Sequence, residues 1–286
     1  ALALVPSDVD VCVSLDMDEV LQPGWRQALE AAWVKGFTNV CWHWFVLTPG
    51  HEYISRRVHA RNNYHWRWPV HEQVVRIGGG EAFADAGKGM TMVHRPLGEN
   101  PSHPSYLPLL ELAVREEPNC CTMLFYLCRE HHLHAQHQRC IDVAEKYLAA
   151  DTTTWPPEKC AVLRYASSSF MGLGKWREAE RWLQRACMEH PEEREPFCEL
   201  AQMHHDRKEP LKAYAAALDA LKIETHASHF LENPLCWRHW PHHLAACGAV
   251  DVGLRDEAKK HLQQALSISP HDQNLGNLKA FVEGLK

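Results

Sequence analysis

The chain has 286 residues, of which 45% are hydrophobic and 23% charged, and its formal net charge at pH 7 is -6. This composition is typical of a folded globular protein with one large or two smaller domains, and it excludes an intrinsically disordered chain. The acidic balance and the absence of a Lys/Arg-rich run argue against a broad surface for nucleic acid or anionic membranes, although a small basic patch stays open. No stretch approaches 18 continuous apolar residues, so no membrane span is expected.

Eleven cysteines are scattered along the chain, often within helical patterns. An odd number in a chain of this length favours reduced, buried thiols over a framework of disulfides. No secretory signal precedes the first strand-like segment, so the expected location is cytoplasmic. Because the first residue is Ala1 and a strand-like segment follows almost at once, we expect that something is missing upstream.

The N-terminal third has the pattern of a mixed α/β region, in which short apolar runs alternate with one helical segment. The predicted elements are, in chain order, a strand at Val9–Leu15, a helix at Gly24–Val34, and strands near Thr38–Leu47, Tyr53–Ala60, Val70–Ile77 and Met90–His94. From Ser105 onward, helical patterns rich in Ala, Leu and Glu replace the strands. The proline-rich stretch Pro96–Pro104 is the predicted hinge, which gives two domains, 1–100 and 105–286.

The first predicted strand runs into three carboxylates, Asp16, Asp18 and Glu19, within four positions. Like charges at this spacing repel, and a bound cation would relieve the repulsion. A simpler interpretation makes the carboxylates a cap for the helix that starts near Pro23. The segment therefore predicts either a cation site or a helix cap.

The second region contains internal repeats, which residue spacing reveals. One copy has the spacing of a tetratricopeptide repeat (TPR) in Gly174, Ala179, Ala186 and Pro191. Its two alanines recur 34 residues later as Ala213 and Ala220. All four residues recur 79 residues later as Gly253, Ala258, Ala265 and Pro270. The third copy is eleven residues later than two repeats would place it, so we expect an insertion at Thr225–His239. A weaker first copy covers Met123–Ala149. The small residues occupy positions where two antiparallel helices approach closely.

Taken together, these motifs resemble the family 2 glycosyltransferases, in particular those fused to TPRs. The motifs that carry the resemblance are Asp-x-Asp-Glu at 16–19, the arginine-bearing segment Arg56–Val74 with its Val-His-Glu turn, and the histidine of MTMVHRP at Met90–Pro96. The resemblance implies a GT-A-like, Rossmann-like α/β domain, followed by an all-α TPR-like helical repeat domain. The α/β domain is apparently incomplete at its N-terminus, because a βα unit takes roughly 30 residues and only about fifteen precede the carboxylates.

The implied activity is a metal-dependent transfer, with inversion, of a sugar from a nucleotide-sugar donor to a hydroxyl of a glycan, peptide or other acceptor. A divalent cation neutralises the departing diphosphate, and Mn²⁺ or Mg²⁺ is the expected cofactor because both prefer oxygen ligands. By the resemblance, Asp18 and His94 would hold the metal. Asp16, Arg57 and Arg61 would bind the donor.

The transfer also needs a base that takes the proton of the acceptor. Glu72 is the favoured candidate and His71 is its rival, since both lie in the Val-His-Glu turn. The tryptophans Trp42 and Trp44 alternate at strand spacing, and core packing explains them at least as well as sugar stacking. His94 taken alone would more often be a structural histidine.

The competing hypothesis is a non-catalytic TPR scaffold whose N-terminal region is a degenerate relic of a transferase. In that case the repeats would hold a protein partner. A nucleic-acid acceptor receives no support from the acidic net charge. The histidine-rich segments Cys128–Cys140 and Cys236–His243 lack the paired C-x2-C spacing of a structural zinc site, so zinc is not predicted there.

Overall fold

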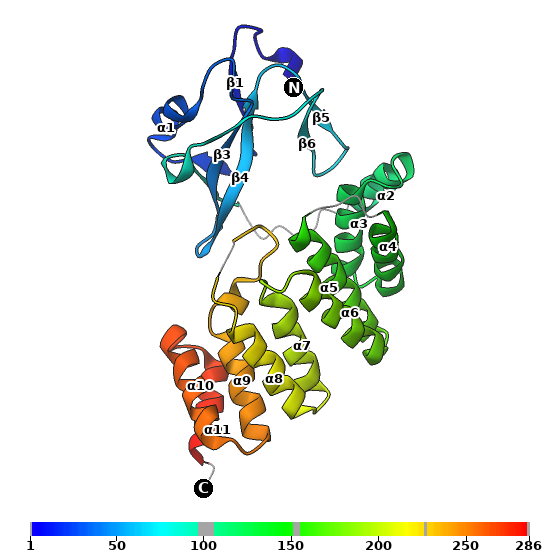
Figure 1. Cartoon of the computed structure of the whole chain (residues 1–286), viewed down its shortest axis with the longest axis vertical. Coiled ribbons are helices and arrows are strands. Elements are labelled where there is room, and N and C mark those ends of the chain that lie inside the picture. The colour runs from blue at the N-terminus through cyan, green and yellow to red at the C-terminus, as the bar shows by residue number, and fades with distance from the viewer. Residues whose placement is uncertain (1, 97–105, 151–154, 226–227, 285–286) are drawn as a thin grey trace. The chain divides into compact units, whose positions relative to one another are not determined.

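The structure is a computed structural model that describes residues 2–96, 106–150, 155–225 and 228–284. The chain divides into two compact units (Figure 1). Unit 1 comprises Ala1–Ala113 and Ser228–Phe230, and unit 2 comprises Val114–Ala227 and Leu231–Lys286. Apart from Pro96, the predicted hinge lies outside the described residues, so the domain boundary at 100–105 stays a prediction.

Unit 1 is built on one mixed sheet with the strand order β1-β4-β3-β8-β2 and with β7 paired to β3. A separate two-stranded ribbon contains β5 and β6. The elements are β1 (Val11–Val13), β2 (Glu19–Leu21), α1 (Trp25–Ala32), β3 (Val40–Thr48), β4 (His51–Ala60), β5 (Tyr64–Arg67), β6 (Gln73–Arg76), β7 (Phe83–Asp85) and β8 (Thr91–His94), with short 3-10 turns at Leu2–Leu4 and Gly87–Gly89.

The hairpin of β3 and β4 is the centre of this sheet. Pro49 and Gly50 form its two-residue turn between the paired Thr48 and His51, and Gly50 adopts a positive φ of 83°. A connection this short can join only antiparallel strands. One face of β3 is buried, through Cys41, His43 and Phe45, while Trp42 and Trp44 on the other face are half-buried. The core beneath α1 contains Leu29, Cys41, Val58 and Met90.

The predicted Rossmann-like sheet is therefore wrong. Only β7 and β8 run parallel to β3, whereas the pairs β1–β4, β3–β4 and β2–β8 are antiparallel. The physical reason is the short connections, since a parallel βαβ crossover needs a dozen or more residues, usually including a helix. Strands β2, β5 and β7 are missed from the sequence because segments of three or four residues show no periodicity.

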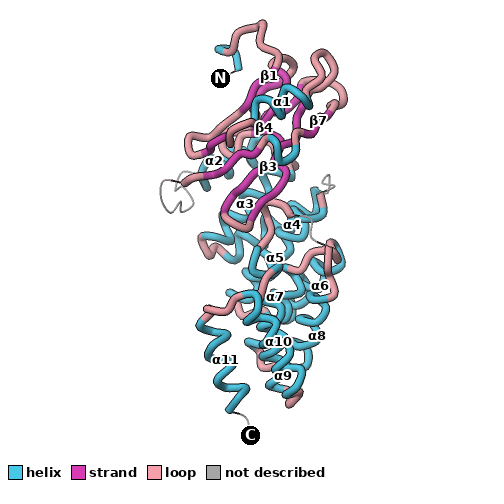
Figure 2. The backbone as a smooth tube through the Cα atoms, turned by 90° about the vertical axis from the view of Figure 1, so that its left-hand side faces the viewer, coloured by secondary structure: helices cyan, strands magenta, loops and turns pink. Residues whose placement is uncertain are grey.

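Unit 2 is all-helical within the described residues. Its antiparallel helices follow one another in a stack, ending with α11 (Figure 2). The helices are α2 (Tyr106–Glu116), which spans the division between the units, then α3 (Cys121–Leu133), α4 (His137–Ala150), α5 (Pro156–Gly172), α6 (Trp176–Glu189), α7 (Glu195–Asp206), α8 (Pro210–Leu221), α9 (Trp240–Asp251), α10 (Arg255–Ile268) and α11 (Gln273–Gly284), with a 3-10 turn η3 at Pro234–Trp237.

The same turn joins the two helices of four successive pairs. In each turn a backbone N–H donates to the carbonyl five residues earlier, and the donors are Gln136, Lys175, Glu209 and Leu254. The residue just before each donor has a positive φ, at Ala135, Gly174, Lys208 and Gly253. Four helical hairpins therefore repeat, and we call their first helices (α3, α5, α7, α9) the A helices and their second helices (α4, α6, α8, α10) the B helices. The extra residues lie between α8 and α9, as the predicted insertion at Thr225–His239 requires.

The predicted packing of the repeat alanines is confirmed. Ala179, Ala213 and Ala258 are at most 2% exposed, and each lies on a B helix. In the second repeat, the Ser167 hydroxyl of α5 donates to the Ala179 carbonyl of α6 over 2.9 Å. Only small side chains fit where the paired backbones approach this closely.

Replacing Ala179 with leucine is therefore expected to lower the free energy of unfolding of unit 2 by about 1–3 kcal/mol, because the added atoms overpack the α5–α6 contact. Ala215→Leu is the matched control, since Ala215 is exposed on α8, and it is expected to stay within about 0.5 kcal/mol of wild type. Urea denaturation of the full chain measures both changes. Equal losses in the two variants would contradict the assigned repeat register.

Candidate functional site

An arginine pairs with two of the three carboxylates in the cluster of unit 1. One Arg57 Nη1 donates to Asp16 Oδ2 over 2.8 Å and to Glu19 Oε2 over 2.9 Å. Glu19 Oε2 also accepts the backbone N–H of Asp16. The Glu19 side chain is only 2% exposed, and burial raises its pKa, opposed by the Asp16 N–H and by Arg57. The segment that the sequence marks as a cation site or a helix cap is thus a tight turn closed by a guanidinium.

Asp18 and His94, the two predicted metal ligands, lie in contact. His94 Nε2 is 3.2 Å from Asp18 Oδ2, and His94 Nδ1 is buried without a hydrogen-bond partner. Register places His94 directly opposite Glu19 in the β2–β8 pair. However, the described residues contain no group of three or more side chains able to hold a metal ion, and Arg57 already binds two of the carboxylates. This arrangement fits a guanidinium better than a divalent cation, and the metal role of Asp18 and His94 stays a prediction.

The other predicted site residues lie in separate contacts. Arg61 donates through Nε and Nη2 to the carbonyl of Val5, over 3.1 and 2.8 Å. Its guanidinium is thus hydrogen-bonded to the backbone. His71 has a positive φ of 50°, and its ring packs against Tyr106 with 5.2 Å between centroids. Glu72 is exposed between β5 and β6. Their predicted roles in donor binding and base catalysis stay untested.

The half-buried tryptophans of β3 have structural partners. Trp42 stacks on Phe83 of β7, with 5.4 Å between ring centroids and 15° between ring planes. Trp44 donates its indole N–H to Glu52 over 2.7 Å, and Lys88 lies over its ring at 4.6 Å. These contacts favour packing over sugar stacking for this pair.

In unit 2, side chains on consecutive A helices contact one another. The His132 ring of α3 stacks on the Tyr165 ring of α5 at 4.9 Å and 19°. Arg164 of α5 donates through Nε and Nη2 to Glu199 Oε1 of α7, over 2.8 and 2.5 Å. The contacts link the first three repeats along one side of the array.

The link continues from α7 to α9, where His205 Nδ1 lies 3.9 Å from Asp251 Oδ2. We call this set of side chains the A-helix surface: Arg129, His132, Arg164, Tyr165, Glu199, His205 and Asp251. All except Arg164 are partly or fully exposed. Sequence reasoning missed these residues, although the repeat register could have identified them as the non-core positions of the A helices.

The insertion is packed against α7 as part of the fold. Glu195 Oε1 accepts the backbone N–H of Asn233 over 2.8 Å and the indole N–H of Trp237 over 3.2 Å. Arg194 lies 4.8 Å from the centre of the Trp237 ring, and Cys236 is fully buried in the core of α7, α8 and α9. The insertion therefore covers the N-terminal end of α7, while Glu199 and His205 further along the helix stay partly exposed.

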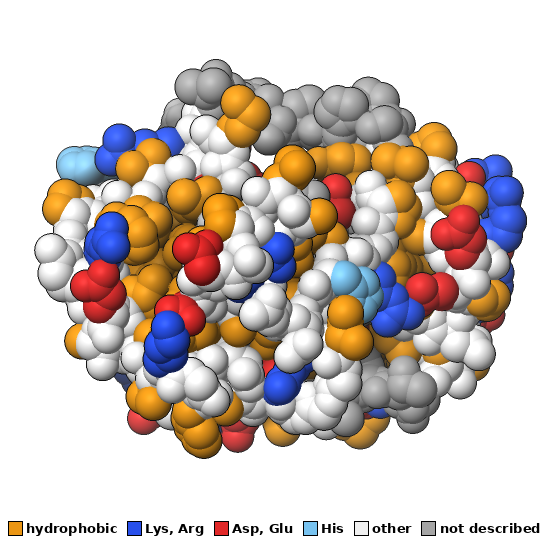
Figure 3. All heavy atoms as spheres, turned by 90° about the horizontal axis from the view of Figure 1, so that it is seen from above, with side chains coloured by type: hydrophobic (Ala, Val, Ile, Leu, Met, Phe, Trp, Pro, Cys, Tyr) orange, Lys and Arg blue, Asp and Glu red, His pale blue; other side chains and the backbone are white. Residues whose placement is uncertain are grey.

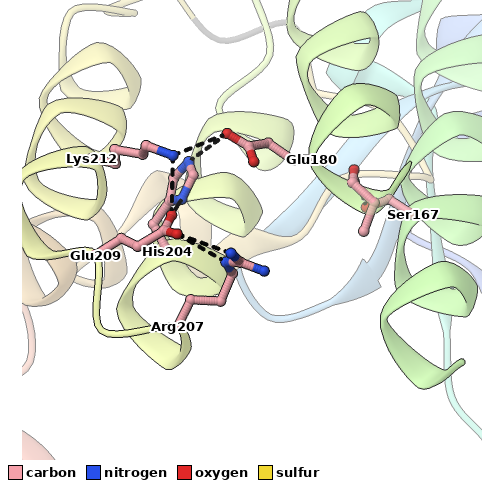
Figure 4. A network of polar contacts seen from close by, with 7 residues as sticks. Ser167, Glu180, His204, Arg207, Glu209 and Lys212 are labelled. Atoms are coloured by element: carbon pink, nitrogen blue, oxygen red, sulfur yellow. Dashed lines mark hydrogen bonds and ion pairs between the residues drawn. The ribbon is translucent and has the colours of Figure 1, made fainter. Parts of the chain in front are cut away.

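A polar network joins the second and third repeats (Figure 4). His204 at the end of α7 lies between Glu209, 2.8 Å from its Nδ1, and Glu180 of α6, 3.8 Å from its Nε2. Lys212 contacts both carboxylates, and Arg207 donates twice to Glu209. The first repeat has the uncharged counterpart, in which His131 Nδ1 lies 2.9 Å from Gln136 Oε1.

Glu209→Gln is expected to lower the thermal midpoint of unit 2 at pH 7. Hydrogen bonds from Arg207 and then His204 lower the pKa of Glu209 to about 2, below the ordinary value of 4.5. A group with a lowered folded-state pKa stabilises the fold above its unfolded-state pKa, and this contribution is lost as pH falls from about 4.5 towards 2. In calorimetric scans, the difference in thermal midpoint between wild type and the variant should therefore become smaller as the pH falls from 4.5 to 2. Asp219→Asn, in an exposed pair with Lys222, should show a smaller deficit at pH 7.

Side chains of both charges are interspersed on the face that Figure 3 presents. No helix among the described residues is long and apolar enough to cross a membrane. Both observations agree with the expectations from composition.

No family model and no curated protein matches the sequence. Solved structures do match, and the three named below are described as TPR proteins. A thermophilic TPR protein from Thermus thermophilus has 21% identity and a TM-score of 0.44, over 63% of this chain and 89% of its own. YrrB, described as a TPR protein with an unusual peptide-binding site, has 14% identity and a TM-score of 0.47, over 61% and 81%. A TPR protein from Parabacteroides merdae has 17% identity and a TM-score of 0.47, over 61% and 63%.

These findings correct the interpretation drawn from the resemblance. The predictions of a family 2 glycosyltransferase and of an enzyme are contradicted by the similar structures named above, which are TPR proteins. The sheet of unit 1 also lacks the predicted parallel order. The helical repeats predicted from residue spacing are confirmed by the four helical hairpins, as the competing hypothesis requires.

Proposed function

We propose that the chain is a protein-interaction module that binds a segment of a partner protein along the A-helix surface. The contacts between consecutive A helices carry this proposal, because they align partly exposed side chains of separate repeats along one side of the array. Stacked helical repeats present such extended surfaces, and their neighbouring repeats support one another.

The residue types on this surface suit binding. Tyrosine and arginine supply much of the energy at protein interfaces, since they combine a large contact area with directed hydrogen bonds. Tyr165 and Arg129 lie on the consecutive A helices α5 and α3, and both are partly exposed. The surface carries both signs of charge, so a partner segment with mixed polar and aromatic side chains fits it better than a uniformly charged one.

Selection from a displayed peptide library against the full chain tests this function. We expect enriched peptides whose dissociation constants rise at least about tenfold with Tyr165→Ala or Arg129→Ala, a loss of about 1.4 kcal/mol in each case. Gln184→Ala, on the exposed side of α6, is the matched control and should bind as wild type does. Circular dichroism establishes that all three variants fold.

Two outcomes would count against the proposal. One is a selection that enriches no peptide. The other is a set of peptides whose affinity is indifferent to Tyr165 and Arg129, which would place the binding surface elsewhere.

A further inference from the structure

The first repeat holds two thiols in contact. Cys128 Sγ on α3 lies 3.6 Å from Cys140 Sγ on α4, and also 3.7 Å from the Cys140 carbonyl. Both cysteines are fully buried, and neither is part of the A-helix surface. The pair spans the two helices of one hairpin, so a covalent bond between the sulfurs would cross-link that hairpin.

The repeat itself explains why the two residues meet. In the second repeat the equivalent positions hold Ser167 and Ala179, where the hydroxyl donates to the carbonyl across the same separation of 12 residues. The third repeat has Ala201 and Ala213, and the fourth has Ala246 and Ala258, all of them fully or almost fully buried. The close approach is thus a property of the hairpin, and only the first of these four repeats places sulfur on both sides of it.

The environment distinguishes the two thiols chemically. The Cys128 thiol donates to the Cys140 carbonyl, and the contact between the two sulfurs raises the pKa of Cys128 well above its usual range and lowers the pKa of Cys140. The thiolate is the nucleophilic form of cysteine, so Cys140 is the better attacking group and Cys128 the resolving one.

We propose that Cys128 and Cys140 are a redox-active pair that forms a disulfide between α3 and α4 when the protein meets a peroxide. Cys140 loses its proton, its thiolate attacks one peroxide oxygen, and the O–O bond breaks, so that Cys140 becomes a sulfenic acid and the departing hydroxide takes up that proton to form water. The Cys128 sulfur then attacks the Cys140 sulfur, the S–O bond breaks, and the released hydroxide takes the Cys128 proton to form water. Two thiols and one hydrogen peroxide thereby give one disulfide and two water molecules.

Because both sulfurs are buried, the oxidant reaches them through opening of the α3–α4 hairpin. Repeat arrays open locally, and such openings expose groups that are buried in the closed form. Once formed, the bond closes a loop of about thirteen residues and holds the hairpin shut. Oxidation should therefore be slow in buffer, faster in a low urea concentration, and stabilising once complete.

The test treats the full chain with hydrogen peroxide, blocks the remaining thiols by alkylation, and identifies cross-linked peptides by mass spectrometry. We expect a Cys128–Cys140 cross-link, and a thermal midpoint of unit 2 raised by about 5 °C that returns to its original value after reduction. Cys140→Ala and Cys128→Ser should abolish both effects. Both variants should fold, because the second repeat holds alanine and serine at these positions.

A transplanted pair provides the positive control. Ser167→Cys combined with Ala179→Cys, in the Cys140→Ala background, places two sulfurs at the equivalent positions of the second repeat and should restore a peroxide-dependent cross-link between α5 and α6. The proposal is overturned if oxidised wild type contains no Cys128–Cys140 cross-link, if other cysteine pairs form in preference, or if the cross-link leaves the midpoint unchanged.

Discussion

Arg57→Ala is expected to lower the free energy of unfolding of unit 1 by about 2–3 kcal/mol. The Glu19 side chain is 2% exposed, and without the guanidinium its carboxylate would lose its nearest positive charge while remaining buried. Removing one partner of a buried ion pair is costly because the other charge stays desolvated. Asp16 loses the same arginine but is 65% exposed, so it contributes little to the deficit.

Two variants give this prediction its control. Adding Glu19→Gln to Arg57→Ala removes the stranded charge, so the double variant should be more stable than Arg57→Ala alone. Arg26→Ala, in an exposed pair with Glu30 on α1, should cost less than about 0.5 kcal/mol. Denaturant titration followed by the tryptophans of unit 1 measures each value. If Arg57→Ala costs no more than Arg26→Ala, the guanidinium is not what stabilises the cluster.

The pH dependence offers an independent check of the same contact. Burial already raises the pKa of Glu19 in the wild type, and loss of Arg57 should raise it further. At lower pH the stranded carboxylate takes up a proton and its penalty disappears. The loss in free energy of unfolding caused by Arg57→Ala should therefore be largest near pH 7 and smaller near pH 5.

The carboxylate cluster shows what sequence reasoning can and cannot reach. Crowding of Asp16, Asp18 and Glu19 is visible in the sequence, and it correctly indicates that a positive charge must be nearby. The sequence does not say which one. Arg57 lies 41 residues from Asp16, and it arrives there because β4 pairs with β1 next to the carboxylate turn. Long-range pairing of this kind has no periodic signature, so the sequence alone predicts a cation site or a helix cap and does not identify Arg57.

The repeats are predictable for the opposite reason. Close packing of each hairpin demands small residues at fixed positions, and the same demand recurs with every repeat, so Ala179, Ala213 and Ala258 appear at countable spacings. Side chains between repeats are less constrained. The stacking of His132 on Tyr165 and the ion pair of Arg164 with Glu199 depend on how consecutive A helices lie against each other, which spacing alone does not fix.

Acidification from pH 7 to pH 5 is expected to lower the free energy of unfolding of both units, by about 3 kcal/mol in total. Burial lowers the pKa of His43 in unit 1 and of His242 in unit 2 to about 4 each, and in unit 2 the neighbouring His261, 3.1 Å away, adds to the shift. Histidines whose pKa is lowered less are His59, His132, His243 and His261. One pKa unit corresponds to about 1.4 kcal/mol, and partial exposure reduces the contribution of each group.

The direction of the effect follows from linkage. Above about pH 6.5 these histidines are neutral in both the folded and the unfolded chain, so they contribute no pH dependence. Below that value the histidines bind protons in the unfolded chain but stay neutral in the folded chain, because their folded-state pKa is lower. Stability is therefore lost progressively as pH falls towards 4. Urea titrations at pH 7, 6 and 5 should show midpoints that fall in this order, with separate transitions wherever the two units unfold independently.

Leucine substitutions assign the effect to individual residues. The ring of His43 is buried and its only polar contact with the described residues is a weak one with the Cys41 backbone, so His43→Leu removes a titrating group at little cost in hydrogen bonding. At pH 7 the free energy of unfolding of this variant should be within about 1 kcal/mol of wild type. The variant should reduce the pH dependence of stability in unit 1 alone. His242→Leu should flatten that of unit 2 alone, since it also relieves the repulsion that His261 would feel on protonation. A wild-type stability that stays constant from pH 7 to pH 5 would show that these histidines take up protons without unfolding, through local openings that the static packing does not reveal.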